Sequence, residues 1–286
     1  MLVIGAVVSV QFGGALAATL VPIIGASGSV TVRLVFAAAV MLLIARPALH
    51  GHSRADWATV VAFAVALGLM NLSFYSALAR LPIGVAVTIE FLGPLTLATV
   101  LSRRWRDLVS VAFAAFGVVL ISGALTTPWG DLDLIGLGLA LAAGTCWASY
   151  IILSGRTGRR FPQLDGLAIA MLISAVLVAP VGLVEAGSSL WSWDTLWRGL
   201  GIALLSSVLP YSLELMALRR LSANVFGILL SLEPAVAAVA GLVVLGQRLG
   251  GVELLGMALV VAASALVMGR RPQRKRSREP AEAASS

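Results

Sequence analysis

The stretch that decides the fold is NLSFYSALARLPIGVAVTIEFLGPLTLA, residues 71–98, because a related stretch recurs later in the chain. Sliding the sequence by 140 positions places it on YSLELMALRRLSANVFGILLSLEPAVAA, residues 211–238, with eight identical residues. Each copy is a pair of apolar runs joined at a basic residue, and each carries a proline in its second run, Pro94 and Pro234. The recurrence predicts a chain built from two similar halves that share this helical hairpin.

The composition identifies the environment of these runs. Of the 286 residues, 59% are apolar and 12% are charged, and the mean hydropathy is +1.00. Soluble proteins carry about a quarter of their residues as charged side chains, so a soluble globule is excluded, and disorder requires low hydrophobicity. The net charge of +7 would indicate a nucleic-acid partner in a soluble protein. In an apolar chain we expect the lipid bilayer as partner instead, and no nucleic acid.

A membrane-spanning helix needs about 20 apolar residues, and the runs divide the chain into ten such helices. The expected spans are 2–20, 28–45, 57–78, 82–101, 108–125, 134–153, 166–184, 197–218, 223–246 and 252–269. Five spans per half give the halves opposite orientations, so the predicted fold class is an all-α integral membrane protein with ten transmembrane helices in two inverted five-helix repeats. The predicted domains are a first repeat at 1–126, a second at 134–269 and a disordered basic tail at 270–286. Inverted repeats are common in secondary transporters, although a duplicated channel or receptor would share them.

The basic residues predict the orientation. If the N-terminus is cytoplasmic, sixteen Arg and Lys residues fall in inside loops and the tail, against three outside. This positive-inside bias places both termini in the cytoplasm. The first run lacks the basic start of a secretory signal peptide, so we expect it to remain as a span.

Four ionisable residues lie away from the span ends: Arg33, Glu90, Glu214 and Glu233. Because a charge in hydrocarbon costs about 2.5–3.5 kcal/mol on insertion scales, we expect these side chains to face a cavity or a partner. For Arg33 two interpretations stay open. It either extends its guanidinium towards the membrane surface or acts as counter-ion to a carboxylate.

Proline accompanies each of the three glutamates. In IEFLGPL (89–95), Pro94 removes a backbone donor and frees the carbonyl of Glu90, and Gly93 allows close approach by another group. In SLEPA (231–235) the acid directly precedes the proline, and in LPYSLE (209–214) it follows one. Broken helices at corresponding places point to a transporter site. Protonated, hydrogen-bonded structural glutamates or simple kinks are the alternatives.

Other polar and aromatic side chains are expected to line the same cavity, although ordinary packing would explain each aromatic residue equally well. The predicted substrate- and proton-binding residues are Glu90, Glu214, Glu233, Arg33, Gln11, Asn71, Tyr75, Trp147, Tyr150 and Tyr211. The predicted helix-break residues are Gly93, Pro94, Pro210 and Pro234.

Enzymatic signatures are missing from the sequence. It has no nucleotide-binding loop, no HExxH pair and no plausible catalytic triad, so we expect no catalytic residues, no cofactor and no enzyme. Cys146 is the only cysteine, and a loop metal site at His50 and His52 is conceivable but not expected. Active transport would then use an ion gradient rather than ATP.

The ordered set of motifs resembles the EamA-type drug/metabolite transporters, most closely their threonine/homoserine exporter subgroup. SVQFGGALA (9–17), TVRL (31–34) and GTCWASYIILSG (144–155) carry the resemblance together with the three glutamate motifs, over residues 1–269. The resemblance implies efflux of small metabolites across the inner, cytoplasmic membrane, coupled to protons, through a cavity shared by both halves. It also implies a short leader before the first span, so we expect the natural start upstream of Met1.

The predicted function is proton-coupled export of neutral amino acids such as threonine or homoserine by alternating access. The predicted partners are this small-molecule substrate and protons. Efflux of aromatic compounds or drugs by the same fold is the alternative, favoured by Trp147 and Tyr150. An integral-membrane enzyme or a sensor is the alternative from another class.

Overall fold

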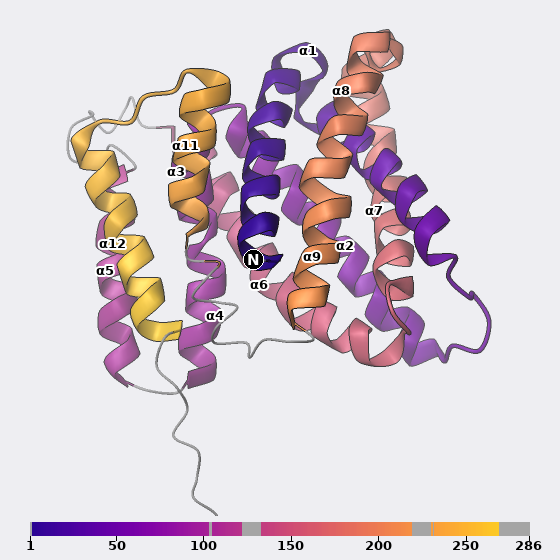
Figure 1. Ribbon diagram of the computed structural model, residues 1–286, viewed down its shortest axis with the longest axis horizontal. Coiled ribbons are helices and arrows are strands. Elements are labelled where there is room, and N and C mark those ends of the chain that lie inside the picture. Colours follow the sequence, from indigo (N-terminus) through magenta and orange to yellow (C-terminus); the bar gives the residue numbers. More distant parts are fainter. Residues whose placement is uncertain (1, 103–104, 122–132, 219–229, 231, 269–286) are drawn as a thin grey trace, which may run out of the picture.

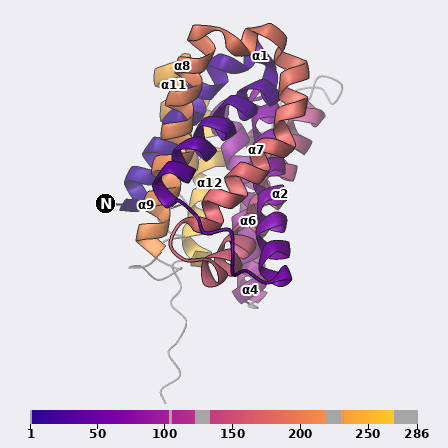
Figure 2. The ribbon, with the colours of Figure 1, turned by 90° about the vertical axis from the view of Figure 1, so that its right-hand side faces the viewer.

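The protein is a bundle of helices that run along a common direction (Figures 1 and 2). The computed structural model describes residues 2–102, 105–121, 133–218, 230 and 232–268, and these ranges contain helices but no strand. A helix satisfies its own backbone hydrogen bonds, which hydrocarbon cannot do, and the predicted all-α class is confirmed. The helices are α1 (Leu2–Ala45), α2 (Arg54–Leu78), α3 (Ile83–Glu90), α4 (Leu92–Ser102), α5 (Trp105–Ile121), α6 (Leu134–Arg160), α7 (Asp165–Ala186), η2 (Gly187–Trp191), α8 (Trp193–Ala203), η3 (Leu204–Val208), α9 (Leu209–Leu218), α11 (Glu233–Leu245) and α12 (Gly251–Met268).

Within the described ranges, five helical segments are long and apolar enough to cross a membrane. They are Leu2–Ala45, Arg54–Leu78, Leu134–Arg160, Asp165–Trp191 and Trp193–Glu214. The shorter apolar helices include Ile83–Leu97, Glu233–Leu245 and Gly251–Ala263. Several membrane-crossing segments in one chain make this a multi-pass membrane protein.

The loop expected between residues 20 and 28 is absent, which corrects the sequence prediction. α1 is helical on both sides of Gly25, which alone takes a non-helical conformation with φ 75° and ψ 172°. The chain reverses there, at the top of the bundle in Figure 1. A Cβ at this position would overlap the side chain of Glu185. One glycine therefore replaces the loop, because it supplies the positive φ and leaves room for a carboxylate from α7.

The predicted eighth span is divided into α8, the π-helical turn η3 and α9. The predicted ninth span starts at residue 223, but residues 223–229 and 231 lie outside the described part of the chain, and α11 begins at Glu233. The inside arginines at 103, 104, 219 and 220 and the predicted tail at 270–286 also lie outside it.

Helices from the first and second halves of the sequence pack against each other. α5 packs on α12 at one end of the bundle and α1 packs on α7 at the other, with α3 and α11 between them (Figure 1). α2 packs on α6, and an ion pair joins these two helices at each end. Asp56 pairs with Arg160 at 3.1 Å at one end, and Arg80 pairs with Asp133 at 3.3 Å at the other.

Asp133 should contribute more stability than its ion-pair partner, because it is also the N-cap of α6. Its carboxylate accepts a hydrogen bond from the backbone N–H of Gly136 at 2.8 Å. We expect Asp133→Ala to cost about 1 kcal/mol, as for other N-caps, and Arg80→Ala to cost under about 1 kcal/mol, as for exposed ion pairs. Thermal melting of both purified variants measures the difference, and equal losses would contradict the capping role.

The stability that the Asp133 carboxylate contributes should depend on pH. Chiefly the hydrogen bond from Gly136, and then Arg80, hold the pKa of Asp133 below its ordinary value of 3.8. A carboxyl whose pKa is lowered by folding stabilises the protein fully above that ordinary value, and the contribution disappears as the pH falls through the lowered pKa. The melting difference between Asp133→Ala and the parent should therefore be constant above about pH 5 and shrink below about pH 4.

Candidate functional site

The helix break beside Glu90 brings backbone against backbone at the centre of the bundle. α3 ends at Glu90, and α4 begins at Leu92 after a single turn residue. Pro94 has no N–H to give to the Glu90 carbonyl, and that carbonyl lies against Gly144 of α6. A Cβ on Gly93 would overlap the carbonyl of Gly144 in the same contact. The two glycines thus permit the close crossing of α4 and α6.

Enlarging either glycine should separate the two helices. We expect Gly93→Val to lower the melting temperature and the yield of folded protein, because overpacking costs about 1–3 kcal/mol and here the neighbour is rigid backbone. Gly138→Val on α6 is the matched control, because a Cβ there meets nothing within 4 Å. Equal melting temperatures for the two variants would mean that the crossing is not tightly packed.

The π-helical turn η3 exposes carbonyl groups towards α1. Leu209 donates its N–H to the Leu204 carbonyl, five residues back, as a π-helix requires. Pro210 then has no N–H for the Leu205 carbonyl in the π pattern, or for the Ser206 carbonyl in the α pattern. The Leu205 carbonyl accepts from Ser9 Oγ at 2.6 Å, and the Ser206 carbonyl accepts from Arg33 at 2.8 Å. Side chains of α1 therefore satisfy the carbonyls that Pro210 leaves without donors.

Arg33 is buried inside the protein, with 5% of its surface exposed. Its Nε donates to Ser207 Oγ at 2.8 Å, Nη1 to the Tyr75 hydroxyl at 3.2 Å and Nη2 to the Ser206 carbonyl. The guanidinium carbon also lies 5.5 Å from the centre of the Tyr75 ring. Arg33 therefore joins α1, α2 and η3 through three hydrogen bonds.

This geometry excludes one sequence interpretation of Arg33, its extension to the membrane surface, while its role as counter-ion to a carboxylate stays a prediction. The side chain does not extend to the membrane surface, because its neighbours on two other helices supply acceptors inside the bundle. It also forms no ion pair within 4 Å with a carboxylate in the described ranges. Its charge instead acts on Glu90 over a longer distance.

Glu90, Glu214 and Glu233 converge from α3, α9 and α11. Glu90 and Glu233 are buried, with 9% and 4% of their surfaces exposed, and Glu214 is half-buried. The charges of Glu90 and Glu214 both act on Glu233, so the three carboxyl groups form one electrostatic cluster. None of them forms an ion pair with any residue of the described ranges. The structure thus brings together carboxyl groups that lie 124 and 19 residues apart in the sequence.

Two tyrosine rings lie near the carboxyl groups, since the charge of Glu214 acts on both Tyr150 and Tyr211. The rings of Tyr150 and Tyr211 have centroids 5.9 Å apart, and those of Tyr150 and Phe63 are 5.2 Å apart. Trp147 meets Phe91, the residue at the break of α3 and α4, at 5.8 Å. The predicted aromatic residues therefore fall into separate contacts, Tyr150 with Tyr211 and Phe63, and Trp147 with Phe91.

Two further predicted residues, Gln11 and Asn71, are buried on α1 and α2. Asn71 is buried on α2, where its amide nitrogen donates to the Leu67 carbonyl of its own helix at 2.8 Å. Asn71 is thus partly used by local structure rather than by the carboxyl cluster.

The sequence interpretation missed the serines that hold Arg33. Ser206 and Ser207 had no pattern of their own, but Pro210 carried a usable signal, because it frees the carbonyl four residues earlier. Ser206 Oγ is also buried with no hydrogen-bond partner in the described part of the chain, and it packs on Gly13 of α1. A proline within a membrane helix therefore indicates carbonyl groups in the preceding turn that need donors from another helix.

Metal binding has no support in the described ranges, where no group of three His, Cys, Asp or Glu side chains could hold an ion. His52 stacks on Phe161 at 4.3 Å and meets the edge of Trp57, while its Nε2 is 3.0 Å from the Ala48 carbonyl. It thus lies in an aromatic contact between the loop and the ends of α2 and α6.

Known proteins resemble this chain over most of its length. It is 38% identical over 270 residues to the threonine/homoserine exporter RhtA of Salmonella typhimurium, covering 93% of this chain and 91% of the relative. It is 39% identical over 259 residues to RhtA of Escherichia coli K12, covering 91% and 87%. An uncharacterized transporter of Bacillus subtilis, YwfM, is 27% identical, with coverage of 87% and 86%.

A solved crystal structure of a protein 18% identical in sequence matches with a TM-score of 0.65, over 92% of this chain and 94% of the other, which shows the fold alone. The sequence profile of the EamA-like transporter family matches residues 134–269. Together with the identity to the exporters, this match confirms the resemblance read from the motifs. The chain therefore belongs to the EamA-like transporter family, and it is a membrane transporter rather than an enzyme.

Proposed function

We propose that the protein exports small neutral amino acids, threonine and homoserine above all, in exchange for protons by alternating access. The observation that carries this proposal is the cluster of Glu90, Glu214 and Glu233 beside Arg33, in a chain so similar to threonine/homoserine exporters. An amino acid carries an ammonium and a carboxylate, and the cluster offers groups of opposite charge to each. Charged groups inside a membrane protein commonly serve substrate and proton pathways.

In this mechanism the ammonium and the proton compete for the same carboxylates. From the cytoplasm the substrate ammonium binds Glu90, and its carboxylate binds Arg33 or the N-terminus of α11. On the outside, protons replace the ammonium on the carboxyl groups and the amino acid leaves. Return of the protonated site to the cytoplasmic side releases the protons there. Glu214 and Glu233 extend the proton-binding capacity of the cluster. Gln11, Asn71, Tyr75, Trp147, Tyr150 and Tyr211 line the site.

We infer that the fold behind this exchange is ten spans in two inverted five-helix repeats, at 1–126 and 134–269. Contacts that exchange under such symmetry support the inference. Symmetry between the two repeats would map the helix pair α2 and α6 onto the pair α9 and α1, and the helices of both pairs pack on each other. α3 packs on α11 and α5 on α12, and each of these pairs exchanges onto itself. Pro94 and Pro234 lie at equivalent positions of the two halves.

We place both termini in the cytoplasm and the protein in the inner membrane. The distribution of arginines supports this orientation, because the inside loops and the C-terminal tail together carry 15 of the 19 arginines. The turn at Gly25 and the segment η2 then lie on the outer side.

Transport by purified protein tests the proposal. Proteoliposomes loaded with labelled threonine or homoserine should release the label faster when the outside is made more acidic than the inside. A protonophore should remove the acceleration. A rate of release that does not depend on the pH gradient would contradict proton coupling. No release of either amino acid would contradict threonine and homoserine as substrates.

Efflux of aromatic compounds or drugs is the second candidate. The ring contacts of Tyr150 with Phe63 and Tyr211, and of Trp147 with Phe91, favour it, because aromatic surfaces can stack on a planar ligand. Growth of overexpressing cells on toxic amino-acid analogues and on cationic dyes separates the two. Protection against the analogues alone supports amino-acid export.

A further inference from the structure

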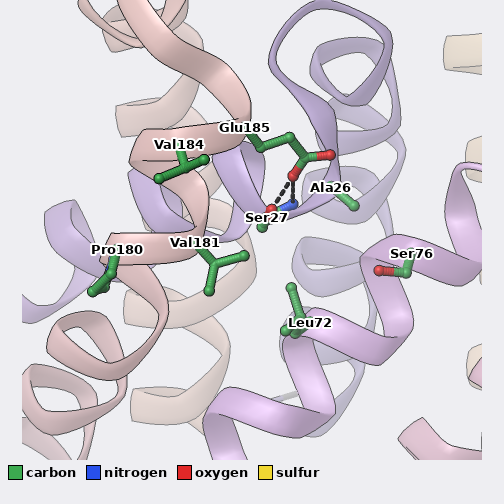
Figure 3. A pocket seen from close by; sticks show the side chains of 8 residues that line it. All are labelled: Ala26, Ser27, Leu72, Ser76, Pro180, Val181, Val184 and Glu185. Atoms are coloured by element: carbon green, nitrogen blue, oxygen red, sulfur yellow. Dashed lines mark hydrogen bonds between the residues drawn. The ribbon is translucent and has the colours of Figure 1, made fainter.

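A groove of about 700 Å³ lies beside the turn of α1, away from the carboxyl cluster. Figure 3 shows its walls, with Pro180, Val181 and Val184 of α7 on one side and Leu72 and Ser76 of α2 on the other. Glu185 closes one end, above Ser27. The groove is therefore mostly apolar and has a single carboxylate at its head.

Glu185 is an exposed residue whose carboxylate lies against Gly25. Its Oε2 accepts from the Ser27 backbone N–H at 3.0 Å and from Ser27 Oγ. These bonds satisfy the first turn of the helix that resumes after Gly25. No cation of the described ranges forms an ion pair with Glu185, so its charge lacks a partner in that part of the chain.

The groove opens towards the lipid at the level of the membrane interface. Val184 is 86% exposed, and Val181, Leu177 and Val176 of the same helix are exposed as well. Just beyond α7, Trp191, Trp193 and Trp197 are also exposed. Exposed tryptophans mark the headgroup level of a bilayer, and exposed aliphatic side chains before them mark its hydrocarbon. Glu185 lies between the two, where headgroups meet acyl chains.

We propose that this groove binds one phospholipid with a primary ammonium headgroup, whose ammonium pairs with the Glu185 carboxylate while an acyl chain follows Leu72, Pro180, Val181 and Val184. The negative charge of Glu185 favours an ammonium headgroup, and the apolar walls favour a lipid acyl chain over a small polar substrate. Ser76, across the groove from Glu185, is positioned to donate to the lipid phosphate. The bound ammonium would stabilise the Gly25 turn, which carries the helix that contains Arg33.

Lipid selectivity of the full-length protein tests the proposal. The protein is placed in nanodiscs of phosphatidylethanolamine or phosphatidylcholine with the same acyl chains, and its melting temperature and co-purifying lipid are measured. We expect a higher melting temperature with phosphatidylethanolamine, and up to about fivefold more of it retained, as for an exposed ion pair. Glu185→Gln should abolish this preference while its amide oxygen still accepts from Ser27. Glu253→Gln, a carboxylate of α12, is the matched control and should keep the preference.

A second variant covers the case in which Glu185→Gln folds poorly. Val181→Trp fills the exposed wall of the groove and should reduce retention of phosphatidylethanolamine while leaving Glu185 in place. Retained preference in both variants would overturn the proposal. Displacement of the lipid by threonine from the parent protein would also overturn it, because the occupant would then be the substrate. Loss of the preference with unchanged threonine export separates this site from the proposed transport function.

Discussion

Replacing Arg33 with methionine should lower the melting temperature sharply and abolish export. The change removes the donors to Ser207 Oγ, the Ser206 carbonyl and the Tyr75 hydroxyl. Each buried acceptor left without a partner costs about 1–3 kcal/mol, and three of them act at one position. The contact of α1 and α2 with the π-helical turn is lost at the same time, so we expect the largest stability loss of any single arginine substitution in the described ranges.

Two further variants separate the contributions of charge and geometry. Arg33→Lys keeps the charge but cannot hold three acceptors in the plane of a guanidinium, so it should recover part of the stability and little of the transport. Arg198→Met is the matched control, because Arg198 is exposed and pairs only with Asp194 one turn away on its own helix. Melting temperatures and threonine efflux of the three variants measure the effect. A parent-like melting temperature for Arg33→Met would contradict the structural role.

Glu90→Gln should remove the pH-gradient dependence of export. If Glu90 binds the substrate ammonium and a proton in turn, the amide can do neither, and loss of one partner of a buried charge pair costs about 2 kcal/mol or more, about thirtyfold in affinity. Gradient-driven efflux of labelled threonine should fall accordingly. The protein should fold normally, because glutamine fills the same space and Glu90 has no ion pair to lose in the described ranges.

Comparison with two other carboxyl groups makes this result specific. Glu233→Gln should also reduce the gradient-driven component, because Glu233 belongs to the same electrostatic cluster. Glu253→Gln should leave it unchanged. Efflux of Glu90→Gln at the parent rate, with the parent's dependence on the gradient, would remove Glu90 from the mechanism.

Much of the fold could be predicted because membrane helices are encoded locally. The span predicted at 57–78 is the body of α2, and the span predicted at 134–153 is most of α6, since length and apolarity alone identify such segments. The boundaries at Gly25 and at η3 could not be predicted. A single glycine serves as a turn only because Glu185 of another helix satisfies the backbone beside it, and a π-helical turn is stable only because α1 supplies donors to its carbonyls.

By itself the sequence determined that the chain is a multi-pass helical membrane protein, that its arginines favour one side and that three glutamates are out of place in hydrocarbon. These properties follow from composition and from runs of neighbouring residues. The tertiary structure alone decided that the partners of Arg33 are neutral groups 42 to 174 positions away, and that Glu185 caps a helix 158 positions earlier. Such contacts depend on how helices cross, and that geometry is set by packing of the whole bundle rather than by any local pattern.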